Sequence, residues 1–132
     1  MQPKIGFIGS HRQDILNDLN FAIRNKFDYY EIQAAGKERE LNLEAEIIEE
    51  AKKISIKNNI SLNLHTSSFV YLCSLRPEVP KAAFELAKEE MILASKVGAK
   101  KITIHSGHVD PSRGKETIGF EILIKNLEKL NK

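Results

Sequence analysis

Two short segments, Ile60–His65 (Ile-Ser-Leu-Asn-Leu-His) and Lys101–His105 (Lys-Ile-Thr-Ile-His), share one pattern. In each, apolar residues alternate with polar ones, and a histidine ends the run. Such alternation is typical of a β-strand, in which successive side chains point to opposite faces of the sheet. Both segments follow stretches with helical spacing of apolar residues. If the two strands are parallel neighbours, we expect both imidazoles at the carboxyl edge of the sheet, where α/β proteins place their chemistry.

The same alternation of strand and helix runs along the whole chain. We expect strands at residues 4–9, 29–33, 60–64 and 101–104, and helices at about residues 14–25, 43–58, 80–97 and 117–130. Strands that alternate with helices predict right-handed βαβ units and a parallel sheet. We therefore predict one α/β domain over residues 1–132, with four parallel strands.

The faces of the expected strands favour a barrel over an open sheet. One face of strands two to four is polar near the carboxyl end, and its residues are Glu31, Gln33, Asn63, His65, Thr103 and His105. The opposite face is apolar, whereas an open sheet covered on both sides favours apolar residues on both faces. A complete (β/α)8 barrel needs about 250 residues, and this chain has 132. We predict half of a TIM barrel, (β/α)4, with the helices on the outer face.

Composition sets limits on the environment of the protein. The chain is 42% hydrophobic and 29% charged, which suits a single globular domain with a real core. Its net charge of +2 neither favours nor excludes nucleic acid as a partner. Cys73 is the one cysteine, which fits a reducing compartment. No segment approaches the roughly 18 apolar residues of a membrane span, so we expect a cytoplasmic protein without a membrane partner.

The two histidines are candidate metal ligands. Neutral imidazole binds zinc and similar divalent ions well, and catalytic zinc usually has three protein ligands and one open position. His65 and His105 would supply two of them, and Glu31 on the same face is a candidate for the third. Such a metal stabilises a developing oxyanion, as phosphate-ester hydrolysis and sugar isomerisation both require. The alternative is that these residues only form hydrogen bonds at the strand ends.

Two long loops follow the histidine strands, at residues 66–79 and 106–116. Long loops at this edge of a parallel sheet are usually functional. Tyr71 and Leu72 are expected either to project as an aromatic and apolar wedge or to pack the first loop onto the body. His108, in the second loop, is a residue that supports the metal ligands, a substrate contact or a solvated loop residue.

The stretch from Leu62 to Gly107 resembles the endonuclease IV family, within the wider xylose isomerase-like TIM-barrel superfamily. The matching residues are Leu-Asn-Leu-His65-Thr-Ser, Tyr71-Leu72-Cys-Ser-Leu75, Pro80-Lys-Ala-Ala, Lys88-Glu-Glu, Val97-Gly98-Ala, Ile102-Thr-Ile-His105-Ser-Gly107 and Ile124-Lys-Asn126-Leu. The resemblance implies that His65 and His105 bind zinc or another divalent metal. It also implies a DNA-repair hydrolase, a phosphodiesterase that cleaves DNA beside abasic sites and contacts the DNA through Tyr71 and Leu72.

Other positions depart from the endonuclease IV pattern. Ile8 occupies the end of strand one, where that family has a histidine, and Glu31 is closer to the sugar isomerase and epimerase branch. The alternative function is therefore a sugar isomerase- or epimerase-like half-barrel that binds a small sugar. For either substrate, Glu31, Gln33, Asn63 and His108 are the expected contacts in the polar cavity.

The sequence ends after the fourth strand–helix unit, so the ligands that the family supplies from strands five to eight are absent. An unpaired edge strand invites pairing with another chain, and a twofold dimer would pair both edges. We therefore expect either a homodimer of half-barrels or a missing C-terminal half. A non-catalytic fragment is the third alternative.

Overall fold

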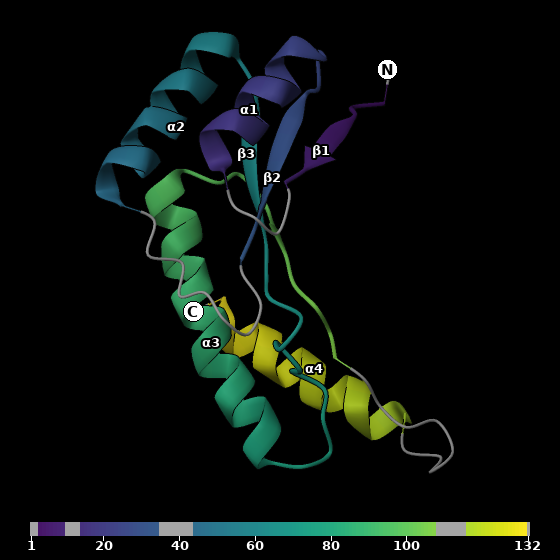
Figure 1. Cartoon of the computed structure of the whole chain (residues 1–132). Coiled ribbons are helices and arrows are strands. Elements are labelled where there is room, and N and C mark those ends of the chain that lie inside the picture. The colour runs from purple at the N-terminus through teal and green to yellow at the C-terminus, as the bar shows by residue number, and fades with distance from the viewer. Residues whose placement is uncertain (1–2, 10–13, 35–43, 108–115, 132) are drawn as a thin grey trace.

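The computed structural model describes residues 3–9, 14–34, 44–107 and 116–131. The elements are β1 (Gly6–Ile8), α1 (Ile15–Arg24), β2 (Tyr29–Gln33), α2 (Ala45–Asn58), β3 (Ser61–His65), α3 (Glu78–Val97), β4 (Ile102–Thr103) and α4 (Glu116–Leu130) (Figure 1). The four strands are all parallel and lie side by side in the order of the sequence. This confirms the predicted (β/α)4 arrangement.

Local sequence explains where several helices begin and end. The Asp14 carboxylate accepts a hydrogen bond from the backbone nitrogen of Asn17 at 3.1 Å and so caps the start of α1. Pro80 lies in the first turn of α3, where its missing N–H costs no hydrogen bond. The helix ends at Gly98, which adopts a left-handed conformation with φ of 72°.

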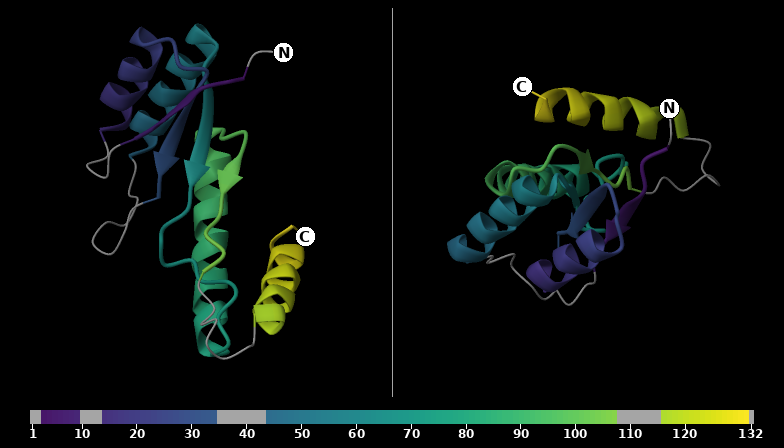
Figure 2. Two further views of the ribbon diagram at one scale, coloured as in Figure 1. Left: turned by 90° about the vertical axis from the view of Figure 1, so that its right-hand side faces the viewer. Right: turned by 90° about the horizontal axis from the view of Figure 1, so that it is seen from above.

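The main core lies between the sheet and helices α1 to α3. Its strand residues are Tyr30, Ile32, Leu62 and Leu64, which pack against helix residues that include Leu19, Ala51 and Ala94. These are the apolar positions of the alternating strands, so the helices cover the predicted face. Seen from above, the helices follow one another around the outside of the curved sheet (Figure 2).

A second, smaller core lies at the carboxyl end of the sheet. Val70 and Leu72, from the loop after β3, are buried against Ala83 and Ala87 of α3. Leu123 of α4 packs against the same cluster. This core ties the first long loop to the last two helices.

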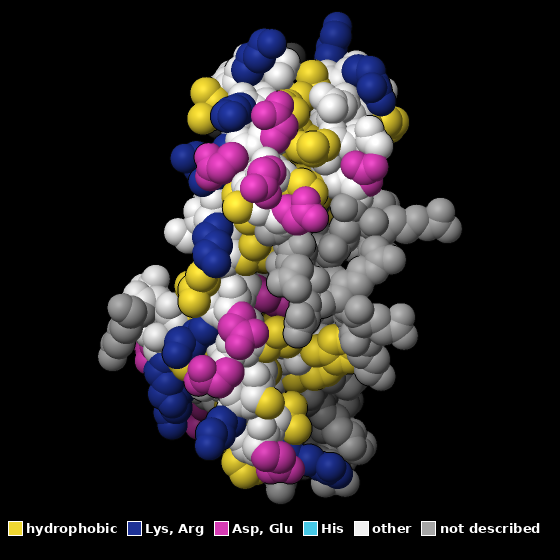
Figure 3. Space-filling model, turned by 60° about the vertical axis from the view of Figure 1, so that its left-hand side comes forward, with side chains coloured by type: hydrophobic (Ala, Val, Ile, Leu, Met, Phe, Trp, Pro, Cys, Tyr) yellow, Lys and Arg dark blue, Asp and Glu magenta, His cyan; other side chains and the backbone are white. Residues whose placement is uncertain are grey.

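The outer surface over α2 and α3 carries acidic and basic side chains with apolar ones between them (Figure 3). Within the part of the chain that the structure describes, no helix has the length and apolarity needed to cross a membrane.

Candidate metal centre

The polar strand ends meet on the inner face of the sheet. Strand register aligns Glu31 with Asn63, and Gln33 with His65. His65 is aligned in turn with Thr103 of β4, and His105 follows Thr103 by two residues. Because aligned residues of a parallel sheet point to the same face, the backbone brings these side chains together.

Glu31, His65 and His105 form a continuous chain of contacts. Nδ1 of His65 lies 3.0 Å from Oε1 of Glu31, and Nε2 of His65 lies 3.0 Å from Nε2 of His105. The two imidazole rings are 4.8 Å apart between centroids and tilted by 59°. Since Nδ1 of His65 donates to the carboxylate, neutral His65 keeps its lone pair on Nε2. Nε2–H of His105 can then donate to that lone pair, or both nitrogens can face one metal ion.

This donor set fits a divalent metal as two of its ligands. Two nitrogens bound to one tetrahedral zinc, each at 2.0–2.1 Å, are about 3.3 Å apart, close to the 3.0 Å between the two Nε2 atoms. A metal-binding histidine commonly donates its other ring N–H to a carboxylate, as His65 does to Glu31. No cluster of three or more His, Cys, Asp or Glu side chains arranged to hold a metal occurs among the described residues.

Thr66 links the two histidine strands just beyond His65. Its backbone nitrogen donates to the carbonyl oxygen of Thr103 at 2.8 Å, and its hydroxyl accepts a hydrogen bond from the backbone nitrogen of His105 at 3.2 Å. Thr66 is buried. It therefore fixes the backbone of one imidazole relative to the other, a role that the alternating pattern of the strands did not indicate.

Glu90 of α3 supports Ser67, the residue that follows Thr66. Both oxygens of its buried carboxylate lie 3.1 Å from the backbone nitrogen of Ser67, which donates to them. Burial raises the pKa of Glu90, and the hydrogen bonds from Ser67 oppose that rise. Glu90 follows Ala87 by three residues and precedes Ala94 by four, so it lies on the buried stripe of α3. In the sequence, the supporting role of Glu90 is indicated only by the position of a charged residue within an apolar stripe.

The side-chain oxygen of Asn63 is a buried polar atom on the inner face of the sheet. Its side chain is 7% exposed, and its Oδ1 has no hydrogen-bond partner among the described residues. A buried acceptor left without a donor costs about 1–3 kcal/mol. A substrate or solvent donor at this position would recover that energy. Gln33, expected in the same cavity, lies half-buried at the end of β2.

The two long loops touch through Tyr71 and Gly107. The backbone nitrogen of Cys73 donates to the carbonyl oxygen of Ser106 at 3.1 Å. Gly107 has a φ of 91°, and a Cβ added there would lie 2.8 Å from Cα of Tyr71, so only glycine fits this approach. Tyr71 itself is 39% exposed.

Leu72 is fully buried in the second core, which agrees with the expectation that the loop packs onto the body. Its carbonyl oxygen accepts a hydrogen bond from Nδ2 of Asn126 in α4 at 2.9 Å. Leu72 thus holds the loop, and Tyr71 is the member of the pair that reaches solvent. His108, the remaining expected substrate contact, lies outside the described residues.

A family model described as xylose isomerase-like TIM barrel matches residues 19–132. The chain belongs to the xylose isomerase-like TIM-barrel family. No curated protein matches the sequence.

Several solved structures share the fold at low sequence identity. D-psicose 3-epimerase from Clostridium cellulolyticum aligns with a TM-score of 0.72 and 16% identity, over 98% of this chain and 47% of that one. Endonuclease IV from Thermus thermophilus aligns with a TM-score of 0.69 and 17% identity, over 93% and 46%. SacUVDE aligns with a TM-score of 0.68 and 16% identity, over 97% and 56%. The chain thus spans about half the length of these solved structures.

Proposed function

We propose that this chain supplies the metal-binding half of an endonuclease IV-like phosphodiesterase that acts on DNA with abasic sites in the cytoplasm. The observation that carries the proposal is the convergence of Nε2 of His65 and Nε2 of His105 to 3.0 Å, with Glu31 on the opposite nitrogen of His65. The chain does not supply a complete site by itself, because catalytic zinc usually has three protein ligands.

Each residue around the two histidines has its own role in the proposed site. His65 and His105 hold the metal through Nε2. Glu31 accepts the Nδ1 proton of His65, which fixes the tautomer and the ring orientation that metal binding needs. Bound zinc supplies Lewis-acid stabilisation of the charge that develops on a phosphodiester. Thr66 holds the backbone of His105 so that its ring faces His65.

Two observations support DNA as the substrate. The segment with Tyr71 and Leu72 resembles the DNA-contacting loop of endonuclease IV, and a structure of that enzyme is among those that share the fold. The exposed Tyr71 lies against Gly107, two residues after His105. An exposed aromatic ring is a suitable surface for stacking against an unpaired base or an opened step of a duplex.

Binding of a labelled duplex with one abasic site tests this function, because binding does not require the complete catalytic site. We expect the zinc-loaded protein to bind this duplex more tightly than the same duplex without the abasic site, and we expect a chelator or His105→Ala to remove the difference. The exposed Lys57→Ala variant, at the far end of α2, serves as the control that keeps the wild-type preference. Equal affinity of the zinc-loaded protein for the two duplexes, or an unchanged preference in His105→Ala, would contradict the proposal.

The second candidate function is a sugar isomerase or epimerase. It is favoured by Glu31 in the middle of β2 and by Oδ1 of Asn63, which has no partner among the described residues and would accept a hydrogen bond from a sugar hydroxyl. It predicts conversion of a ketohexose in a metal-dependent NMR assay. It also predicts no salt-sensitive affinity for DNA, whereas phosphate contacts make DNA affinity fall steeply with salt.

A further inference from the structure

We infer that Glu90 of α3 is a positioning residue of the metal centre. Its carboxylate holds the turn that follows His65, and this turn sets the position of the His105 imidazole relative to that of His65. This role rests on the proposed function, since it takes the two histidines as the metal ligands. The contacts that support it are buried ones between described residues, at the junction of α3 with the ends of β3 and β4.

The position of His105 is not fixed by pairing within the sheet. β4 comprises Ile102–Thr103, and its last aligned pair is Thr103 with His65. His105 lies two residues further along the chain, where its backbone nitrogen donates to the hydroxyl of Thr66 at 3.2 Å. The placement of this imidazole therefore depends on where the chain turns after His65.

Ser67 is the residue at which the chain turns, and both its backbone and its side chain are bonded. Its backbone nitrogen donates to the two carboxylate oxygens of Glu90, each at 3.1 Å. Its carbonyl oxygen accepts a hydrogen bond from the backbone nitrogen of Val70 at 3.2 Å, and its hydroxyl accepts one from that of Phe69 at 3.4 Å. Ser67 is buried, as is Thr66 before it. Among these bonds, the one to Glu90 ties the turn to α3.

Glu90 occupies a position at which packing alone favours an apolar residue. It is 5% exposed and lies on the buried stripe of α3 with Ala83, Ala87 and Ala94. A glutamate is almost never fully buried unless it is paired, because removal of its charge from water is unfavourable. Residues that break the local pattern in this way are expected where a site needs them. The support of the two histidine strands is such a need.

The zinc affinity of matched variants at position 90 tests this role. Glu90→Leu removes the acceptor and keeps a side chain of similar size, whereas Glu90→Gln keeps an oxygen that can accept the bond from Ser67. In calorimetric titrations we expect Glu90→Leu to bind zinc about 10-fold more weakly, the lower end of the range for groups that orient metal ligands. We expect Glu90→Gln to keep the wild-type affinity.

Glu89→Leu, at an exposed position of the same helix, is the matched control and should bind zinc as the wild type does. Helical circular dichroism shows that each variant is folded at the temperature of the titration. A folded Glu90→Leu with wild-type zinc affinity overturns the positioning role of Glu90.

A measurement on the wild type alone keeps the test independent of variant folding. Coupling between two sites is reciprocal, so bound zinc must favour the contact between Glu90 and Ser67 if that contact favours zinc binding. We expect zinc to slow hydrogen exchange at the backbone amides of Ser67 and His105 by a larger factor than at the amides of α2. Equal slowing at Ser67 and in α2 overturns the inference.

Nuclear Overhauser effects in the zinc-free protein separate this role from metal binding itself. The rings of His65 and His105 lie 4.8 Å apart between centroids, close enough for a cross-peak between their ring protons. We expect this cross-peak in the wild type and in Glu90→Gln, and a weaker one in Glu90→Leu. If the wild type shows this pattern but binds no zinc, the proposed metal fails and the positioning role stands. A cross-peak of equal strength in Glu90→Leu and the wild type overturns the positioning role.

Discussion

Glu31, His65 and His105 come from three different strands, yet their functional atoms lie in a line of two 3.0 Å contacts. Strand register explains this placement, because β2, β3 and β4 are aligned so that alternate side chains reach the same face. Two side chains outside this alternating pattern also fix the geometry. The Thr66 hydroxyl accepts a hydrogen bond from the backbone nitrogen of His105, and the Glu90 carboxylate accepts one from the backbone nitrogen of Ser67, the residue after Thr66.

The raised pKa of Glu90 makes a prediction about stability and pH. Burial is the main cause of the rise, with a smaller contribution from Glu89, while Ser67 and His65 oppose it. The folded protein therefore binds the proton more tightly than the unfolded chain. The stabilisation is fully present below the ordinary value of 4.5 and is lost as the pH rises through the folded pKa.

Urea unfolding at a series of pH values above 4.5 should show this loss in the wild type. In Glu90→Gln, which cannot titrate, the free energy of unfolding should fall less over the same range. Glu50→Gln, an exposed residue of α2, is the matched control and should follow the wild type. Parallel curves for the wild type and Glu90→Gln would show that Glu90 does not titrate as described.

Sequence reasoning found the residues that repeat a pattern and missed those that depend on contact between distant elements. His65, His105 and Glu31 could be predicted because alternation alone assigns them to one face. The role of Thr66 depends on how closely β4 approaches β3, which no local pattern specifies. Glu90 gave only a weak signal, as a charged residue in an apolar stripe whose partner, Ser67, is 23 residues away.

At the level of elements, the loop after β3 is held by packing as much as by its ends. Leu72 is fully buried among Val70, Ala83 and Ala87, and Asn126 of α4 binds its carbonyl oxygen. The sequence left two alternatives for Leu72, a projecting wedge or a packed side chain. It could not decide between them, because the choice depends on where α4 lies.

Truncation of Leu72 tests the second core. Leu72→Ala should lower the free energy of unfolding by about 2–5 kcal/mol, through lost apolar contact and a cavity beneath the loop. The exposed Ile56→Ala should change it by no more than about 0.5 kcal/mol at the same protein concentration. Chemical denaturation measures both. Equal effects of the two truncations would mean that the loop is not anchored by Leu72.

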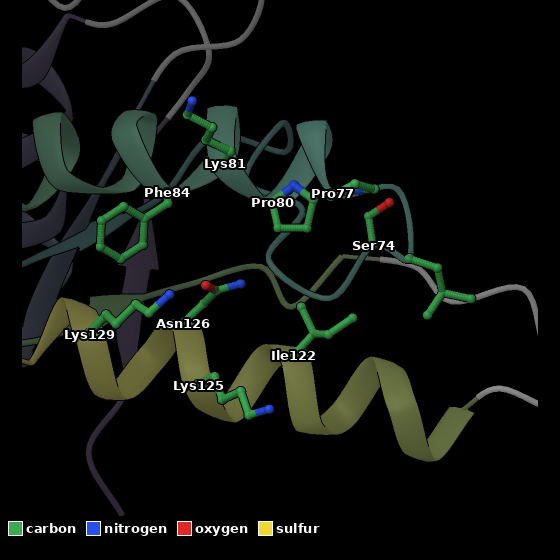
Figure 4. Close-up of a pocket in the computed structure, with 10 residues that line it drawn as sticks. Ser74, Pro77, Pro80, Lys81, Phe84, Ile122, Lys125, Asn126 and Lys129 are labelled. Atoms are coloured by element: carbon green, nitrogen blue, oxygen red, sulfur yellow. The ribbon is translucent and has the colours of Figure 1, made fainter.

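For the whole molecule, the half-barrel fold could be predicted because the two faces of the strands differ in polarity. A polar inner face and an apolar outer face indicated a barrel, and the curved sheet with helices around its outside agrees (Figure 2). The exposure of Phe120, Ile124 and Leu127 in α4 could not be predicted, because helical spacing alone does not say which apolar residues a neighbouring element covers. It becomes clear only from the structure, in which α3 covers the adjacent side of α4 (Figure 4).

The central claim is that His65 and His105 bind one metal ion and that Glu31 orients His65. A zinc titration by calorimetry on the wild type, His65→Ala/His105→Ala and Glu31→Gln tests it most directly. We predict specific zinc binding by the wild type, none by the double variant, and an affinity reduced about 10- to 100-fold by Glu31→Gln. Unchanged zinc stoichiometry and affinity in the double variant would contradict the assignment of the metal centre.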